Sequence, residues 1–236
     1  MWPQVLKAVI FAALLLMANA NGGFFWPFVF IAAAAYMYFQ PLFEWKKFIY
    51  SFLILLFYSW GSISFFSNGL AATAAAIVFS LAFFVLLGVK NFSFLKRDNK
   101  LNVLCGFIYF LISAVFFAAD KTGGFGFIFY FMISFAAFYG ALKEFLDFFH
   151  PDFPKTRKSL IIAGSAFLVM ELASAISFLP LGFLNASALV LLFVFILEDF
   201  ISYHLKGTMN RQAILNNVTI LIVAMIFIFA ASKWTL

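Results

Sequence analysis

Long runs of apolar side chains constrain this chain more than any other feature of its sequence. A helix needs about 20 mostly apolar residues to cross the hydrocarbon core of a bilayer. Read between polar breaks, nine such runs follow one another along most of the chain. They lie at 4-20, 24-39, 48-66, 69-89, 101-118, 124-141, 159-179, 182-200 and 213-232. The sequence therefore predicts an all-α, polytopic integral membrane bundle that forms a single transmembrane domain over 1-236.

Composition supports lipid, rather than water, as the solvent of this chain. Hydrophobic residues make up 66% and charged residues 10% of its 236 residues, whereas soluble domains typically have about 45–50% apolar and about 25% charged residues. The net charge of +6 does not indicate nucleic acid, because the basic residues sit in short loops between spans, as membrane orientation requires. We expect membrane lipids as partners and no nucleic acid. Other membrane subunits are further candidate partners.

The connections between the predicted spans alternate in length and in charge. Tight glycine-containing turns at Asn21-Gly22-Gly23, Ser67-Asn68-Gly69, Thr122-Gly123-Gly124 and Pro180-Leu181-Gly182 alternate with longer charged loops at 40–47, 90–100, 142–158 and 201–212. Together with the N-terminus, the long-loop side carries 13 of the 15 lysines and arginines. Because basic loops stay in the cytoplasm, we predict a cytoplasmic N-terminus and an outside C-terminus in a bacterial or archaeal cytoplasmic membrane.

The first predicted span also resembles a secretory signal. Lys7 precedes an apolar run that ends at Ala18-Asn19-Ala20, a pattern of small residues typical of a cleavage site. Cleavage there would leave eight spans with the same orientation. We expect the segment to be retained as the first helix.

The long connection at 142–158 permits two interpretations. Phe145, Phe148 and Phe149 recur at helical spacing among charged residues, which describes an amphipathic helix at the cytoplasmic interface, a platform for lipid headgroups or a partner. Alternatively, the segment extends the sixth helix until Pro151 and Pro154 end it. We favour the extension.

Glu171 stands apart from the other acidic residues of the chain. Seven of the nine lie in or next to predicted cytoplasmic loops and Asp120 lies in an outside turn, whereas Glu171 is about twelve residues into the seventh span, near the bilayer midplane. A charge there costs at least about 2.5–3.5 kcal/mol, and no lysine or arginine lies at a similar depth. We expect Glu171 to be protonated, hydrogen-bonded, or paired with a bound cation or ligand.

The surroundings of Glu171 predict that its helix face packs against another helix. The neighbouring residues are small, including Gly164, Ser174 and Ala175, and small residues let membrane helices approach closely. We expect this face to point into the bundle. Ser174 and Asn185, the latter through a water molecule, would complete an intramembrane polar site with Glu171.

Two further polar groups are weaker candidates for function. Glu198, Asp199 and His204 at the predicted cytoplasmic end of the eighth helix are catalytic candidates for acid–base work, although solvated interfacial charges explain them more simply. The second group, in the ninth span, consists of Asn216, Asn217 and Thr219. Amide side chains in a span join helices more often than they bind ligands.

The chain lacks the motifs that identify a reaction. It contains no HExxH, Walker or GxSxG motif, and its one cysteine, Cys105, excludes an internal disulfide and a multi-cysteine metal site. We therefore predict no metal and no cofactor, and an enzyme is not the function that we favour.

Three functions remain open. The first is transport, or a membrane-embedded accessory or assembly subunit, with Glu171 lining the interior. The second is an enzyme acting on a lipid or lipid-linked substrate at the cytoplasmic face through Glu198, Asp199 and His204. The third is a purely structural subunit. A transporter should have a polar cavity reaching Glu171 and helices interrupted near Gly61 or Pro180, whereas an enzyme should bring its three polar residues together.

Overall fold

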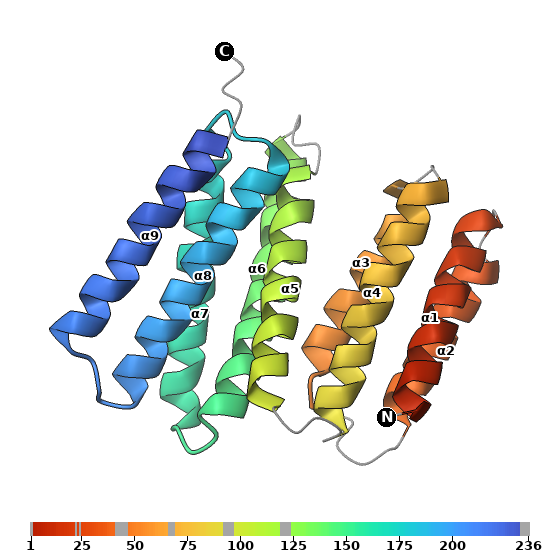
Figure 1. Cartoon of the computed structure of the whole chain (residues 1–236), viewed down its shortest axis with the longest axis horizontal. Coiled ribbons are helices and arrows are strands. Elements are labelled where there is room, and N and C mark those ends of the chain that lie inside the picture. The colour runs from red at the N-terminus through yellow and green to blue at the C-terminus, as the bar shows by residue number, and fades with distance from the viewer. Residues whose placement is uncertain are drawn as a thin grey trace. The chain divides into compact units, whose positions relative to one another are not determined.

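A computed structural model of the chain describes residues 2–21, 23, 25–40, 47–65, 69–91, 97–118 and 124–231. These residues form nine α-helices and no strand (Figure 1). The helices are α1 (Trp2–Ala20), α2 (Phe25–Phe39), α3 (Ile49–Phe65), α4 (Gly69–Lys90), α5 (Arg97–Ala118), α6 (Gly124–Phe149), α7 (Lys155–Ile176), α8 (Phe183–Leu205) and α9 (Arg211–Ala231). Most of the predicted turns at 67–69 and 122–124, and much of the loops at 40–47 and 90–100, lie outside the described residues.

The helices confirm a multi-pass helical membrane protein. Six of those in the described part of the chain are long and apolar enough to cross a membrane: α1, α4, α5, α6, α7 and α8. The apolar parts of α2, α3 and α9 are shorter. The 15 residues of α2 extend about 22 Å, less than the roughly 30 Å of a hydrocarbon core. Nine helices agree with the predicted order, and nine complete spans stay a prediction.

Several helices continue past the charged residues at which the predicted spans end. Helix α6 reaches Phe149, which confirms that the start of the 142–158 connection extends the sixth helix, and α8 reaches Leu205 instead of 200. Backbone chemistry ends α8: Gly207 has a φ of 64°, and the N–H groups of Gly207 and Thr208 donate to the carbonyls of His204 and Tyr203. This is the Schellman arrangement that satisfies the last carbonyls of a helix.

The chain packs as two compact units, Met1–Ile108 and Tyr109–Leu236, with the boundary inside α5. In unit 1, α1 contacts α2, α3 and α4. The rings of Phe11, Phe30 and Phe83 are fully buried there, with the Phe11 centroid 4.9 Å from that of Phe30 and 4.5 Å from that of Phe83. Edge-on and offset ring pairs of this kind are favourable, so part of the abundant phenylalanine builds the core.

Two lysines of unit 1 bind the C-terminal carbonyls of the short helix α2. The Lys7 ammonium donates to the carbonyls of Met37 at 2.8 Å and Gln40 at 2.7 Å. The fully buried Lys90 donates to the carbonyl of Tyr38 and lies 4.2 Å from the centroid of its ring. Helix C-termini leave carbonyls without intrahelical partners and carry partial negative charge, so both cations stabilise this end.

In unit 2, α7 packs against α6 and α8, and α9 packs against α8. The ring of Tyr109 on α5 stacks on that of Phe138 on α6, with centroids 6.0 Å apart. The buried face of α7 consists of side chains spaced three or four residues apart, which include Ile162, Val169 and Ala173. These contacts fix which face of α7 is left uncovered within its unit.

Candidate functional site

Glu171 lies on the uncovered face of α7, and its side chain is exposed. Unit 2 itself leaves this face uncovered, and the expectation that the face points into the bundle stays a prediction. Val169 and Ala173, two positions before and after Glu171, are buried, and at 100° per residue such positions lie on nearly opposite sides of a helix. Among the described residues, no hydrogen bond or ion pair of the Glu171 carboxyl group is found.

The depth of Glu171 follows from the observed ends of α7. Lys158 is the last basic residue at one end of this helix, and the 13 residues from Lys158 to Glu171 rise about 20 Å. With Lys158 at the inner edge of a hydrocarbon core of about 30 Å, Glu171 lies within the core but beyond its midplane.

The surface around Glu171 forms a straight line along the helix, here called the α7 stripe. Its members are spaced three or four residues apart and are all exposed: Leu160, Gly164, Leu168, Glu171 and Ala175. A Cβ atom built on Gly164 would meet nothing within 4 Å, so the stripe is open there. It combines apolar side chains, two small residues and one carboxyl group.

Ser174 and Asn185 do not bond to Glu171 in the described structure. The Ser174 hydroxyl donates to the carbonyl of Met170 at 2.8 Å, within its own helix. Asn185 is half-buried in the first turn of α8. The described structure thus shows no direct hydrogen bond among the three side chains, and the water-bridged polar site stays a prediction.

Glu198 has a different environment, deep inside unit 2. It is 5% exposed and lies seven residues before the end of α8 at Leu205. The hydroxyl of the fully buried Tyr109 on α5 donates to its Oε1. Sequence reasoning missed Tyr109, since a tyrosine in the middle of an apolar run gives no sign of its partner.

Asp199 and His204 do not join Glu198. Both are exposed, and successive helix positions differ by about 100°, which aims the three side chains in three directions. Within the described part of the chain, no group of three histidine, cysteine, aspartate or glutamate residues could hold a metal ion. This arrangement lacks the convergence that the lipid-enzyme hypothesis requires.

Charged side chains lie near His150, which follows the last residue of α6. The Lys158 ammonium lies 2.9 Å from Asp147 Oδ1, which joins the ends of α6 and α7. The Nε2 atom of His150 is buried and finds no hydrogen-bond partner in the described structure. Burial, followed by the positive charges of Lys206 and Lys158, lowers the pKa of His150.

The polar residues of α9 divide between two faces. Asn217 is 6% exposed, and its Nδ2 atom finds no acceptor among the described residues. Asn216 and Thr219 are exposed, with Asn216 accepting a hydrogen bond from Gln212 at 3.2 Å. Asn217 alone of the three therefore lies where an amide could join helices.

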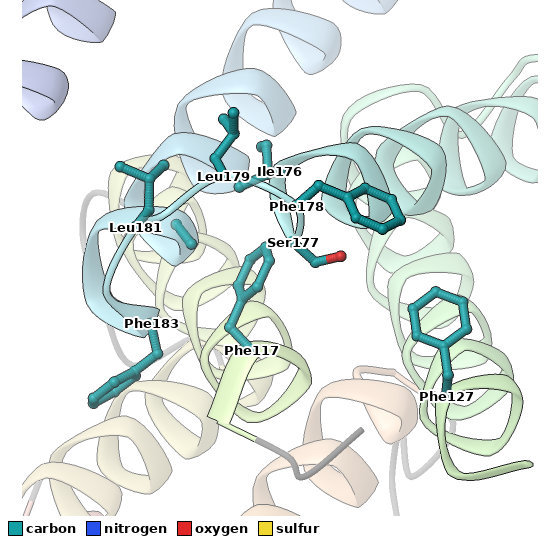
Figure 2. A pocket seen from close by; sticks show the side chains of 9 residues that line it. Phe117, Phe127, Ile176, Ser177, Phe178, Leu179, Leu181 and Phe183 are labelled. Carbon is teal, nitrogen blue, oxygen red and sulfur yellow. The ribbon is translucent and has the colours of Figure 1, made fainter. Parts of the chain in front are cut away.

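A cavity of about 500 Å³ lies at the α7–α8 turn of unit 2. Figure 2 shows Phe117, Phe127 and Phe178 around the side chain of Ser177, and the other lining residues are apolar. No titratable side chain lines this cavity, and Glu171 is not part of its wall. Helix α3 continues through Gly61, and Pro180 lies in the connection after α7. The features expected of a transport site are thus missing around Glu171 in the described structure.

Comparison of the chain with protein-family models, with curated proteins and with solved structures finds no match.

Proposed function

We propose that this chain is a membrane-embedded subunit of a larger assembly in a cell membrane, where the α7 stripe contacts another chain. The observation that carries this proposal is the exposed carboxyl group of Glu171 in the apolar part of α7. Lipids surround the remaining apolar surface, and nucleic acid has no part in this function. The bacterial or archaeal cytoplasmic membrane, with the N-terminus inside, remains the expected location.

The physical reason is the cost of leaving Glu171 in hydrocarbon. Acyl chains offer no hydrogen-bond donor or acceptor, so the carboxyl group loses the bonds that it would make with water. Ionisable side chains in membrane spans almost always face a protein interior or a polar cavity. Neither lies at the Glu171 side chain in unit 2. A contact with another chain would supply the missing partner.

The same observations give the other functions less support. Transport would need a polar cavity that reaches Glu171 and helices interrupted near Gly61 or Pro180. The cavity at the α7–α8 turn is lined by apolar residues and Ser177. A lipid enzyme would need Glu198, Asp199 and His204 together, and they point in different directions. A purely structural role would leave the exposure of Glu171 without an explanation.

The proposal is tested by the size of the purified protein and by the reactivity of Glu171. Extracted from its native membrane in mild detergent, the wild type should migrate in defined complexes larger than one chain. Glu171→Leu should shift it to the size of a single chain. Phe195→Leu, which alters an exposed apolar residue of α8, is the matched control and should leave the complexes intact.

A lipid-soluble carbodiimide, which modifies carboxyl groups in apolar surroundings, provides the second measurement. We expect Glu171 to be protected in native membranes and to react once the complexes are dissociated. A wild-type protein that runs as a single chain in mild detergent, with Glu171 fully reactive in the membrane, would contradict the proposal.

A further inference from the structure

We infer that three exposed cations at one end of unit 2 bind the phosphate headgroup of an anionic phospholipid. These cations, here called the basic cluster, are Lys155 and Arg157 in the first turn of α7 and Lys206 directly after α8. The α7 stripe begins only at Leu160, so the basic cluster is a separate surface. Lipid binding at this surface does not depend on the contact proposed for Glu171.

The basic cluster lies on helix ends that the fold of unit 2 brings together. The Lys158 ammonium is 2.9 Å from Asp147 Oδ1, and this salt bridge joins the start of α7 to the end of α6. Lys206 lies near the same place, since its charge and that of Lys158 both lower the pKa of His150 in the α6–α7 connection. Figure 1 shows the α6–α7 and α8–α9 connections at the same end of unit 2. The cations from α7 and from the end of α8 are therefore neighbours.

The depth of the basic cluster matches the headgroup layer of a bilayer. Helices α7 and α8 are long and apolar enough to cross a membrane, and the cluster begins at the first residue of α7 and ends one residue after α8. Long basic side chains at the ends of spanning helices extend to the interface, so lipid phosphates are the anions that they meet there. The sequence predicts the cytoplasmic side for this end, where anionic lipids make the surface potential negative.

The exposed charges at this end of unit 2 leave a surplus of positive charge. Lys158 and Asp147 neutralise each other. The remaining exposed cations are the basic cluster and Arg211 at the start of α9, and the remaining exposed carboxylates are Asp152 and Asp199. A phosphodiester supplies the missing negative charge, because an arginine binds its oxygens with two parallel hydrogen bonds and a lysine binds it as a point charge. The surface is therefore complementary to an anionic headgroup.

Retention of phosphatidylglycerol tests the basic cluster. The full chain is reconstituted in vesicles of phosphatidylcholine and phosphatidylglycerol and extracted in mild detergent, and the lipid that remains bound is quantified by mass spectrometry. Replacing Arg157 and Lys206 together by glutamine should weaken retention of phosphatidylglycerol about fivefold per charge, equal to about 1 kcal/mol each. The matched control replaces Lys47 and Lys100, two exposed lysines of unit 1, and should retain the wild-type amount. Equal losses in both variants would show a diffuse attraction and overturn the site.

His150 provides a second measurement, because it lies beside the basic cluster. A bound headgroup offsets the positive charges of Lys206 and Lys158 that lower the pKa of His150, so binding should raise this pKa. In a His204→Gln chain, His150 is the one remaining histidine, and NMR of its ring in vesicles follows the titration. Adding phosphatidylglycerol should raise the pKa more in the control double variant than in the double variant of the cluster. Equal rises would overturn the site.

The remaining outcomes distinguish a lipid from a free anion and from a protein. In vesicles of phosphatidylcholine alone, inorganic phosphate should leave the pKa of His150 unchanged. A rise equal to that with phosphatidylglycerol would assign the basic cluster to a free phosphate and overturn the lipid site. If the double variant of the cluster kept its phosphatidylglycerol but lost the complexes larger than one chain, the cluster would contact a protein, and the lipid site would be overturned while the assembly subunit stands. Loss of the lipid with the complexes intact is the expected result.

Discussion

Glu171 and Glu198 lie in neighbouring helices of unit 2, but their carboxyl groups have opposite surroundings. Glu198 is buried and accepts a hydrogen bond from Tyr109. Glu171 is exposed in the apolar part of α7. A buried carboxyl group with a hydrogen-bond partner is costly to remove, but its hydrogen bonding is satisfied within the chain. An exposed one in a membrane requires a partner from elsewhere, so Glu171 is the better guide to function.

His150 provides a pH-dependent test of the charged group at the end of α6. Its pKa lies below the ordinary value of 6.5 because of burial and the charges of Lys206 and Lys158. The unfolded chain therefore binds a proton more readily than the folded chain, and stability should fall as the pH drops below about 6.5. Unfolding of the purified protein in detergent between pH 8 and pH 5 measures this slope.

The matched variants for this pH dependence are two glutamine substitutions. His150→Gln should flatten the slope, because it removes the titrating group. His204→Gln, at an exposed position of α8, should preserve it. A slope that survives in His150→Gln would assign the pH dependence to another residue.

Helix ends depend on single backbone positions, and Gly207 is the clearest of these. Its positive φ closes α8, and a side chain in that conformation costs about 1–2 kcal/mol. Gly207→Ala should therefore lower the free energy of unfolding by about that amount. Chemical unfolding in detergent measures the loss.

Gly61→Ala is the control for this substitution. Gly61 lies within α3, with open space around its Cβ position, so alanine there should stabilise the helix by about 0.5–1 kcal/mol. If both variants shifted stability in the same direction, the special role of the Gly207 conformation would be wrong.

The sequence predicts the positions of the helices along the chain far better than their rotation about their axes. The glycine-bearing turn before Phe183 and the prolines after Phe149 separate helices as expected. Hydropathy does not distinguish a side chain that faces lipid from one that faces another helix, since both surroundings are apolar. Hydropathy therefore could not predict that Glu171 lies on a face of α7 that unit 2 leaves uncovered. The helix of Glu198 continues to Leu205, past the charged residues at which the predicted span ends.

For the whole molecule, alternating connections predict that the two ends of α8 lie on opposite sides of the membrane. In a Cys105→Ala background, Gly182→Cys should react with a membrane-impermeant thiol reagent from outside. Thr208→Cys should react only after the membrane is permeabilised, so that the reagent reaches the cytoplasmic face. Both positions are exposed, and the space around Gly182 is open.

The labelling pattern decides between orientations. Reaction of both cysteines from one side would show that α8 does not cross the membrane. The reversed pattern would keep the crossing and overturn the orientation predicted from the basic loops.

The bond between Lys90 and the end of α2 also has a consequence for biosynthesis. The two residues of this bond are 52 positions apart, so Tyr38 leaves the ribosome well before the lysine that binds its carbonyl. During that interval, Lys7 from the earlier part of the chain is already present to bind the C-terminal carbonyls of α2, whose 15 residues are too short to cross a bilayer of full thickness. The contact between α2 and Lys90 therefore waits for the end of α4, and a nascent chain stopped before Lys90 would lack this second cation at the end of α2.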